Sequence, residues 1–206
     1  MLHTLSFGTR PATDGVLRDM FAARKSVFVD LLKWDVPVID GAYEVDQFDD
    51  EHARYVVLAE PDGRHLGSAR LLPTTRPHIL NSFYSELCED GPPSAPDIFE
   101  ITRFCLDRRL TARERRHVRD TLVCALVEHA LGAGITAYSA IAEMGWFQQI
   151  PAFGWRCTPL GLPRIADRTM LAALRIDIGP DTPALLARAG IVPATSIQGD
   201  ARVVAA

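Results

Sequence analysis

Two charged residues, Glu100 and Arg103, lie inside the apolar segment 97–106, whose β-branched and aromatic residues predict a strand. A buried carboxylate can take a proton from a substrate, and a guanidinium can bind a carboxylate or phosphate. Alternate residues of a regular strand face opposite sides of a sheet, so these two charges would point apart. A β-bulge would redirect them, and bulges often lie beside active sites. The segment therefore predicts either two separate charges or a bulged catalytic strand.

Hydrophobic patterns along the chain predict the elements that position these charges. Strands are expected at 2–7, 53–60, 65–72, 97–106, 135–141 and 170–178, with a hairpin turn at 61–63. Helices are expected at 14–32, 79–87, 113–131, 146–149 and 181–189, the last capped by Asp181. A hairpin followed by helical crossovers predicts an α/β fold, a three-layer α/β/α sandwich with a mixed central sheet. Segment 35–50 is expected to be a mobile loop, and 194–206 a frayed tail.

Composition favours a single domain over residues 1–206, since this length suits one core. The chain has no apolar run near the ~20 residues that span a membrane and no leader pattern, so a cytoplasmic protein is expected. The net charge of −4 argues against a nucleic-acid partner. The four cysteines and six histidines are scattered, so neither a disulfide framework nor a metal site is expected.

Eight residues, in order along the chain, resemble the signature of the acyl-homoserine-lactone synthases, the autoinducer synthases of bacterial quorum sensing. They are Arg24, Phe28, Trp34, Asp46, Asp49, Arg70, Glu100 and Arg103. The surrounding residues are similar to that family over about residues 20–110, and Gly154–Trp155 extends the match. The resemblance implies a fold like that of the GNAT acyltransferases. Its central sheet would be V-splayed, with a bulge in the fourth strand, here 97–106.

The resemblance also implies a reaction: an acyl group passes from an acyl carrier protein or coenzyme A to the amine of S-adenosylmethionine. Lactone closure then releases methylthioadenosine. Both reactants are substrates, so no cofactor is expected. Glu100 is the expected base for the amine, whose proton must leave before attack. The expected catalytic set is Glu100, Arg103, Asp46, Asp49 and Arg70, and the expected S-adenosylmethionine set is Arg24, Phe28, Trp34 and Arg103. Asp49 and Arg70 would equally suit a structural ion network.

The acyl chain needs an apolar tunnel, and each candidate for its lining would also suit a plain core. The candidates are Phe104, Leu122, Leu126, Ala140, Ile141, Met144, Trp146 and Phe153. Some family members carry a threonine associated with 3-oxo-acyl substrates, and an ungapped count from Gly154 places Ala140 there. This favours an unsubstituted acyl chain. Acyl chain length and oligomeric state do not follow from the sequence.

A basic stretch follows the strand at 97–106 and predicts a docking surface for an acidic carrier protein. The candidate docking residues are Arg108, Arg109, Arg115, Arg116 and Arg119. A solvated helix face is the alternative.

Two other functions fit the same fold. An acetyl-CoA-dependent N-acetyltransferase of the GNAT type would need a glycine-rich pyrophosphate loop after the fourth strand, and the corresponding residues 108–113 contain no glycine. A catalytically silent binding domain would not need the complete charged set. Both alternatives are therefore less favoured than acyl-homoserine-lactone synthesis.

Overall fold

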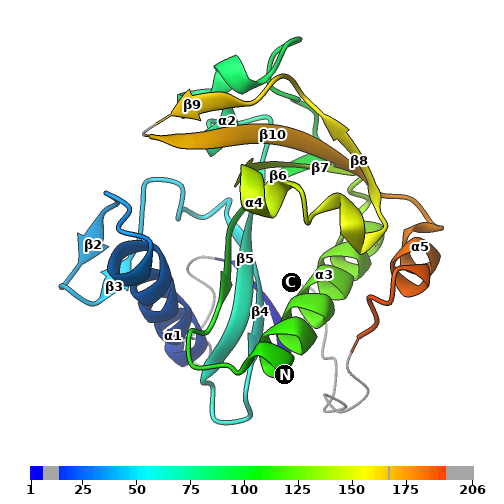
Figure 1. Cartoon of the computed structure of the whole chain (residues 1–206). Helices are drawn as coiled ribbons and strands as arrows, with labels where there is room; N and C mark the ends of the chain where they lie inside the picture. The colour runs from blue at the N-terminus through cyan, green and yellow to red at the C-terminus, as the bar shows by residue number, and fades with distance from the viewer. Residues whose placement is uncertain (7–13, 167, 194–206) are drawn as a thin grey trace. The chain divides into compact units, whose positions relative to one another are not determined.

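The computed structural model describes residues 1–6, 14–166 and 168–193 of the chain (Figure 1). Its elements in chain order are β1 (Leu2–Ser6), α1 (Asp14–Arg24), a π-helical segment (Lys25–Leu31), β2 (Val38–Ile39), β3 (Tyr43–Glu44), β4 (Arg54–Ala59), β5 (His65–Pro73), α2 (Ile79–Phe83), a 3₁₀ turn (Ser85–Leu87), β6 (Ile98–Leu106), α3 (Ala112–Ala133), β7 (Ala137–Glu143), α4 (Met144–Phe147), a second 3₁₀ turn (Pro151–Phe153), β8 (Arg156–Pro159), β9 (Arg164–Ala166), β10 (Thr169–Asp177) and α5 (Thr182–Arg188). Within these residues, no helix is long and apolar enough to cross a membrane.

The chain divides into two compact units, each built from separate stretches. Within the described residues, the first unit contains 1–70 and 103–125, together with Pro193, and the second contains 71–102 and 126–192. Strands β5 and β6 and helix α3 pass from one unit to the other. That residues 1–206 act as one synthase domain stays a prediction.

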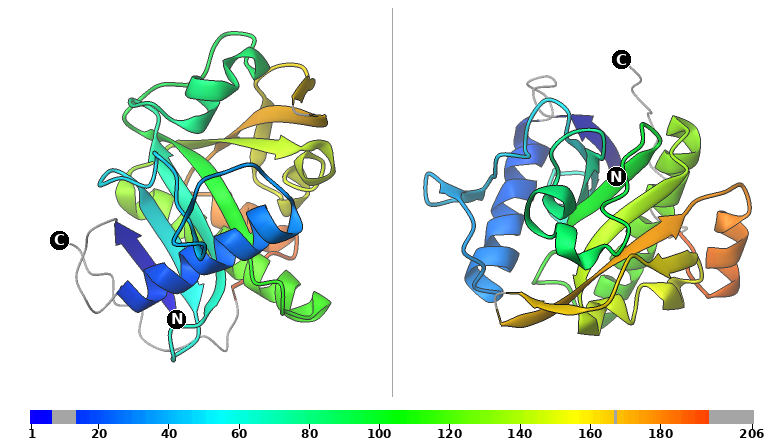
Figure 2. Two further views of the ribbon diagram at one scale, coloured as in Figure 1. Left: turned by 90° about the vertical axis from the view of Figure 1, so that its left-hand side faces the viewer. Right: turned by 90° about the horizontal axis from the view of Figure 1, so that it is seen from above.

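In the first unit, strands β1, β4, β5 and β6 are neighbours in that order, and β1 pairs antiparallel with β4. Helix α1 lies on one side of these strands and the first half of α3 on the other (Figures 1 and 2). Phe21 of α1 packs edge-on against Tyr55 of β4, with ring centroids 5.8 Å apart. On the α3 side, Gly67 allows close packing, because a Cβ there would lie 2.7 Å from Cγ1 of Val118. This unit is therefore a three-layer arrangement.

In the second unit, the strand order is β5, β6, β7, β10 and β8, and β9 pairs with β10. β6 and β7 are parallel, whereas β10 is antiparallel to β7, β8 and β9, which confirms the predicted mixed sheet. The two faces of β7 meet different helices. The Tyr138 hydroxyl donates to the Leu126 carbonyl oxygen of α3, while Ile141, of opposite parity, packs against the cluster formed by Leu80, Leu87 and Ala173. Helical layers thus cover both faces.

Strand β6 is irregular near its centre. It pairs with β7 from Ile98, opposite Ala137, to Ile101, opposite Ala140. Two residues later Arg103 has a φ of 50°, a left-handed conformation that is rare outside glycine. This departure from regular strand geometry agrees with the distortion that was predicted for segment 97–106.

The expected elements occur in the expected order, but the structure departs from them in several places. The helix expected at 79–87 is an α-helix only to Phe83, followed by a 3₁₀ turn, and the helix expected at 146–149 spans Met144–Phe147. The helix predicted at 14–32 is α-helical only to Arg24 and π-helical from Lys25 to Leu31. The predicted loop at 35–50 contains the hairpin β2–β3, and its mobility stays a prediction. β8 and β9 were not predicted, because their residues are mostly exposed and carry no alternating pattern.

A further difference is the start of α5. Asp181 occupies the cap position but makes no side-chain cap hydrogen bond, because its carboxylate pairs with Arg156. The predicted capping interaction is therefore wrong. The tail at 194–206 lies outside the described residues, so its predicted fraying is not tested.

Candidate active site

Three arginines and three carboxylates form a closed cluster in the first unit. Arg24 binds Asp49 with two parallel hydrogen bonds, both 2.8 Å long, and its Nε donates to Glu44 at 2.5 Å. Both carboxylates and the arginine are buried, with exposed fractions of 6% or less. Bidentate arginine–carboxylate pairs fix orientation as well as charge. Arg24 therefore holds the acidic segment against the end of α1.

Arg70 and Arg103 complete the cluster. Arg70 donates to Asp46 at 2.6 and 3.0 Å, and the same guanidinium lies 2.9 Å from Asp49. Arg103 donates to Glu44 at 2.9 Å and to Asp46 at 2.8 Å. Three positive and three negative charges thus balance, as a largely buried network requires.

The acidic segment is shaped by its own backbone contacts. The backbone N–H of Asp46 donates to Asp49, and the N–H of Phe48 donates to Asp46. The Tyr55 hydroxyl of β4 adds a further hydrogen bond of 2.8 Å to Asp49. These turns present both aspartates to the arginines, since aspartate readily accepts hydrogen bonds from nearby backbone groups.

Burial and pairing shift the ionisation of this cluster. Burial alone would raise the pKa of Asp49, but Arg24 and Arg70 hold it well below its usual range. Burial would lower the pKa of Arg24, yet Asp49 and Glu44 raise it above its ordinary value. Burial and the adjacent Asp49 raise the pKa of the Tyr55 hydroxyl. Arg24 and Asp49 therefore stay ionised at neutral pH.

Sequence reasoning identified five of the six charges and missed Glu44. Glu44 is fully buried and bridges Arg24 and Arg103, so it is as central as the aspartates. The sequence did contain a signal for Glu44. Glu44, Asp46 and Asp49 lie within six residues that contain no basic residue, and the expected site residues include three arginines that could pair with three carboxylates.

An aromatic pair lies beside the cluster in the first unit. Phe28 and Trp34 stack with ring centroids 4.8 Å apart and an interplanar angle of 23°. The Arg103 guanidinium lies 5.5 Å from the Phe28 ring and 5.7 Å from the Trp34 ring. Phe28 belongs to the π-helical segment, and the backbone N–H of Trp34 donates to the backbone carbonyl oxygen of Phe28. Phe28 is buried, whereas Trp34 is 38% exposed, so the pair reaches solvent on the Trp34 side.

Glu100 lies in the second unit and is fully buried. Its carboxylate accepts hydrogen bonds from the backbone N–H groups of Ile79, at 2.8 Å, and Leu80, at 3.0 Å. Across the sheet, Glu100 pairs with Ser139 of β7. Backbone N–H groups at the start of α2 therefore fix the carboxylate of Glu100, which is the expected base.

The predicted acyl-pocket residues are not gathered on one surface. Ala140 and Ile141 are consecutive in β7, so their side chains face opposite sides of the sheet and cannot both line one wall. Trp146 and Phe153 lie together, with ring centroids 5.9 Å apart. Leu122 and Leu126 are fully buried on α3, and Phe104 and Met144 are half-buried. Which of these contact an acyl chain stays a prediction.

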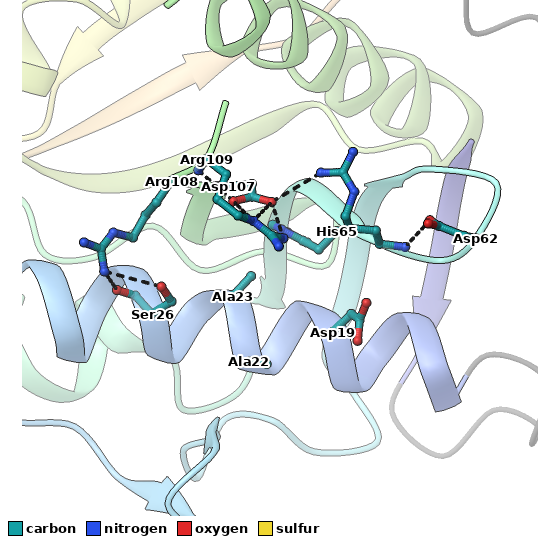
Figure 3. A pocket seen from close by; sticks show the side chains of 10 residues that line it. Asp19, Ala22, Ala23, Ser26, Asp62, His65, Asp107, Arg108 and Arg109 are labelled. Carbon is teal, nitrogen blue, oxygen red and sulfur yellow. Dashed lines mark hydrogen bonds and ion pairs between the residues drawn. The ribbon is translucent and has the colours of Figure 1, made fainter. Parts of the chain in front are cut away.

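The basic residues after β6 mostly reach solvent. Arg108, Arg109, Arg115 and Arg116 are exposed, while Arg119 is half-buried and pairs with Asp120. Arg108 donates to the Ser26 carbonyl oxygen and Arg109 pairs with Asp107. Part of this surface lines a pocket of about 910 Å³ in the first unit (Figure 3). The pocket is bordered by Asp19, Ala22, Ala23, Ser26, Asp62, Arg64, His65, Asp107, Arg108 and Arg109, and contains no member of the charged cluster.

Among the described residues, no group of three histidine, cysteine, aspartate or glutamate side chains is arranged to hold a metal ion.

Comparison with known proteins gives consistent results. A family model described as autoinducer synthase matches residues 10–183. Isovaleryl-homoserine lactone synthase of Bradyrhizobium diazoefficiens is 32% identical over 185 residues, covering 88% of this chain and 82% of that protein. The solved structure of the CoA-dependent acyl-homoserine lactone synthase BjaI, with SAM and isopentyl-CoA, has a TM-score of 0.82 at 32% identity, covering 93% of this chain and 90% of that one. An N-acetyltransferase from Lactobacillus plantarum shares the fold, with a TM-score of 0.53 at 20% identity over 86% and 99% of the two chains.

Proposed function

Because this chain belongs to the autoinducer synthase family and is an acyl-homoserine-lactone synthase, we propose that its charged cluster and aromatic pair bind S-adenosylmethionine. We also propose that Glu100 takes the proton of the substrate amine. Acyl transfer from a thioester to this amine, with lactone closure and release of methylthioadenosine, is the reaction. Both reactants are substrates, and we propose that no further cofactor takes part.

The arrangement of Arg103 carries the assignment of the substrate site. Its guanidinium contacts Glu44 and Asp46 and lies near the Phe28 and Trp34 rings. S-adenosylmethionine has a carboxylate that suits a guanidinium and a sulfonium that suits an aromatic face. The buried Arg24, with Asp49 and Arg70, serves as the frame that fixes the acidic segment. We therefore assign substrate contact to Arg103, Phe28 and Trp34.

Replacing Trp34 with Ala is expected to weaken S-adenosylmethionine binding about two- to thirtyfold, since a cation–π contact contributes about 0.5–2 kcal/mol. Isothermal titration calorimetry measures the change. Leu31→Ala is the matched control, because Leu31 is also exposed and apolar and lies three residues before Trp34. Equal affinities for the two variants would refute a role for the Trp34 ring.

Glu100 and Arg103 are proposed to have different roles, proton acceptance and substrate positioning. The α-amino group titrates near 7.7–8.0 and is mostly protonated at neutral pH, so it must lose a proton before it attacks. Positioning is worth about 7–11 kcal/mol and a base about 10²–10⁴ in rate. We infer that positioning by the cluster contributes more than proton transfer to Glu100.

The acyl chain is proposed to contact part of the apolar set in the second unit, centred on Trp146 and Phe153. Ala140 has no hydroxyl to bond a 3-oxo group, which supports an unsubstituted acyl chain. A panel of 3-oxo and unsubstituted acyl thioesters of equal length tests this preference.

The thioester carrier is proposed to be an acyl carrier protein that docks on the exposed arginines. The opposite charges of such a surface and an acidic carrier speed encounter at low salt. BjaI is described as CoA-dependent, so an acyl-CoA donor is the alternative for this chain.

The variant with Arg115→Glu and Arg116→Glu is expected to raise the KM for the carrier-bound acyl group several-fold in low salt, with the effect shrinking as salt screens the surface. The variant with Arg168→Glu and Arg188→Glu, two exposed arginines outside this stretch, is the control, since it changes the net charge by the same amount. An unchanged KM for the carrier, with turnover of acyl-CoA, would instead favour the CoA donor.

Mass spectrometry of the purified protein, incubated with S-adenosylmethionine and a panel of acyl carrier proteins and acyl-CoAs, tests the function as a whole. Methylthioadenosine and an N-acyl-homoserine lactone are expected in equal amounts. Absence of both products with every donor would refute it.

A further inference from the structure

His78 immediately precedes α2 and is buried, and its ring protonation follows from its contacts. Nδ1 lies 2.8 Å from the carbonyl oxygen of Arg76. A carbonyl oxygen only accepts hydrogen bonds, so Nδ1 carries the hydrogen and donates. Burial lowers the pKa of His78, although the bond to Arg76 opposes this. The ring is therefore neutral, and Nε2 has a free lone pair.

This lone pair has no hydrogen-bond donor in the described part of the chain. The Oγ of Ser139, also fully buried, has no partner there either. Ser139 pairs with Glu100 across β6 and β7, so both side chains lie on one face of the sheet. Buried polar atoms are nearly always hydrogen-bonded, so two unpaired ones in the same unit as a buried carboxylate suggest a ligand that the chain itself does not supply.

The backbone places His78 next to Glu100. The carboxylate accepts hydrogen bonds from Ile79 and Leu80, the two residues that directly follow His78. The peptide group that joins His78 to Ile79 therefore donates its N–H to the buried carboxylate of Glu100.

The reaction needs two proton acceptors. A substrate ammonium has three N–H bonds and the amide product has one, so two protons leave the nitrogen. One must leave before attack, and the other leaves after the C–N bond has formed. The thioester carbonyl offers no donor, so the amine is the donor that matches Nε2.

We propose that Nε2 of His78 accepts the second amine proton and delivers it to the departing thiolate. The proposal rests on the proposed function, in which Glu100 accepts the first proton. After the amine attacks the thioester carbonyl, the N–H bond breaks toward Nε2 as the C–S bond breaks. The imidazolium then protonates the thiolate, which yields the free thiol and returns His78 to its neutral form. Glu100 releases the first proton to solvent.

Two substitutions separate the ring nitrogens. His78→Asn keeps an N–H near the position of Nδ1 for the Arg76 carbonyl and removes Nε2. It is expected to lower kcat with a carrier or pantetheine thioester by about 100-fold, with the KM for S-adenosylmethionine and the thermal midpoint little changed. His78→Gln keeps a polar atom near the position of Nε2, cannot take up a proton, and should be similarly slow.

The leaving group gives the decisive measurement. An aryl thioester releases a weakly basic thiolate that needs no proton, so the ratio of wild-type to His78→Asn kcat should fall from about 100 to about 5 or less. An equal ratio for both donors, or a wild-type rate for His78→Asn, would overturn the proposal. If His78→Asn does not fold, His78→Gln is compared with wild type in the same way. Failure of the wild-type protein to form methylthioadenosine would instead refute the proposed function.

Discussion

Glu100→Gln is expected to slow acyl-homoserine lactone formation by about 10²–10⁴-fold without abolishing it, because removal of a positioned base leaves substrate positioning intact. The glutamine oxygen can still accept one of the two hydrogen bonds from Ile79 and Leu80, but its NH₂ group faces the other N–H. Initial rates of methylthioadenosine release at saturating substrates measure the effect.

The change at Glu100 also removes a structural contact, so stability must be measured alongside the rate. Thermal unfolding of Glu100→Gln reports the cost of the lost hydrogen bond, and S-adenosylmethionine titration reports whether the substrate still binds. A slow, folded variant that binds substrate supports proton transfer. Turnover at the wild-type rate would exclude Glu100 as the base.

Asp49→Asn is expected to lower the free energy of unfolding by about 3–5 kcal/mol, the usual cost of removing one partner from a buried charge pair. Asp49 binds Arg24 bidentately, lies against Arg70 and accepts from the Tyr55 hydroxyl. Without its charge, three arginines face two carboxylates. Urea denaturation followed by circular dichroism measures the loss.

Glu51→Gln is the matched control for this substitution. Glu51 lies two residues away with a side chain that is 83% exposed, so its neutralisation should change the unfolding free energy by no more than about 0.5 kcal/mol. A similar, small loss for Asp49→Asn would show that the cluster contributes little to stability, and the frame role would then rest on substrate binding alone.

Much of this architecture follows from local pattern. Short apolar runs predict β4, β5 and β10, and a helical period predicts α3, because these elements bury one face or more against a core. The hairpin turn between β4 and β5 follows from Pro61, Asp62 and Gly63, the last with a φ of 91°.

Other features depend on contacts that no local pattern encodes. The π-helical segment brings Phe28 and Trp34 together. The hydrogen bond from the backbone N–H of Trp34 to the carbonyl oxygen of Phe28 depends on the backbone conformation of all the residues between them, not on one residue type. The role of Glu44 depends on two arginines that are 20 and 59 residues distant. The start of α2 reaches Glu100 across 20 residues of chain.

Strand alternation alone would have separated Ala140 from Ile141. The two are adjacent in a predicted strand, so period-two geometry already places them on opposite faces. The acyl-pocket set was chosen for apolar character, which does not distinguish the faces of a sheet buried on both sides.

The passage of β5, β6 and α3 through both units has a consequence for synthesis on the ribosome. The first unit needs residues 103–125 as well as 1–70, and the second needs 126–192 as well as 71–102. A nascent chain that ends near residue 100 holds most of the charged cluster but lacks Arg103, so Glu44 and Asp46 have yet to meet one of their cations. Neither unit can be completed before the other has begun, and chimeras between related synthases must exchange more than one segment to replace either unit.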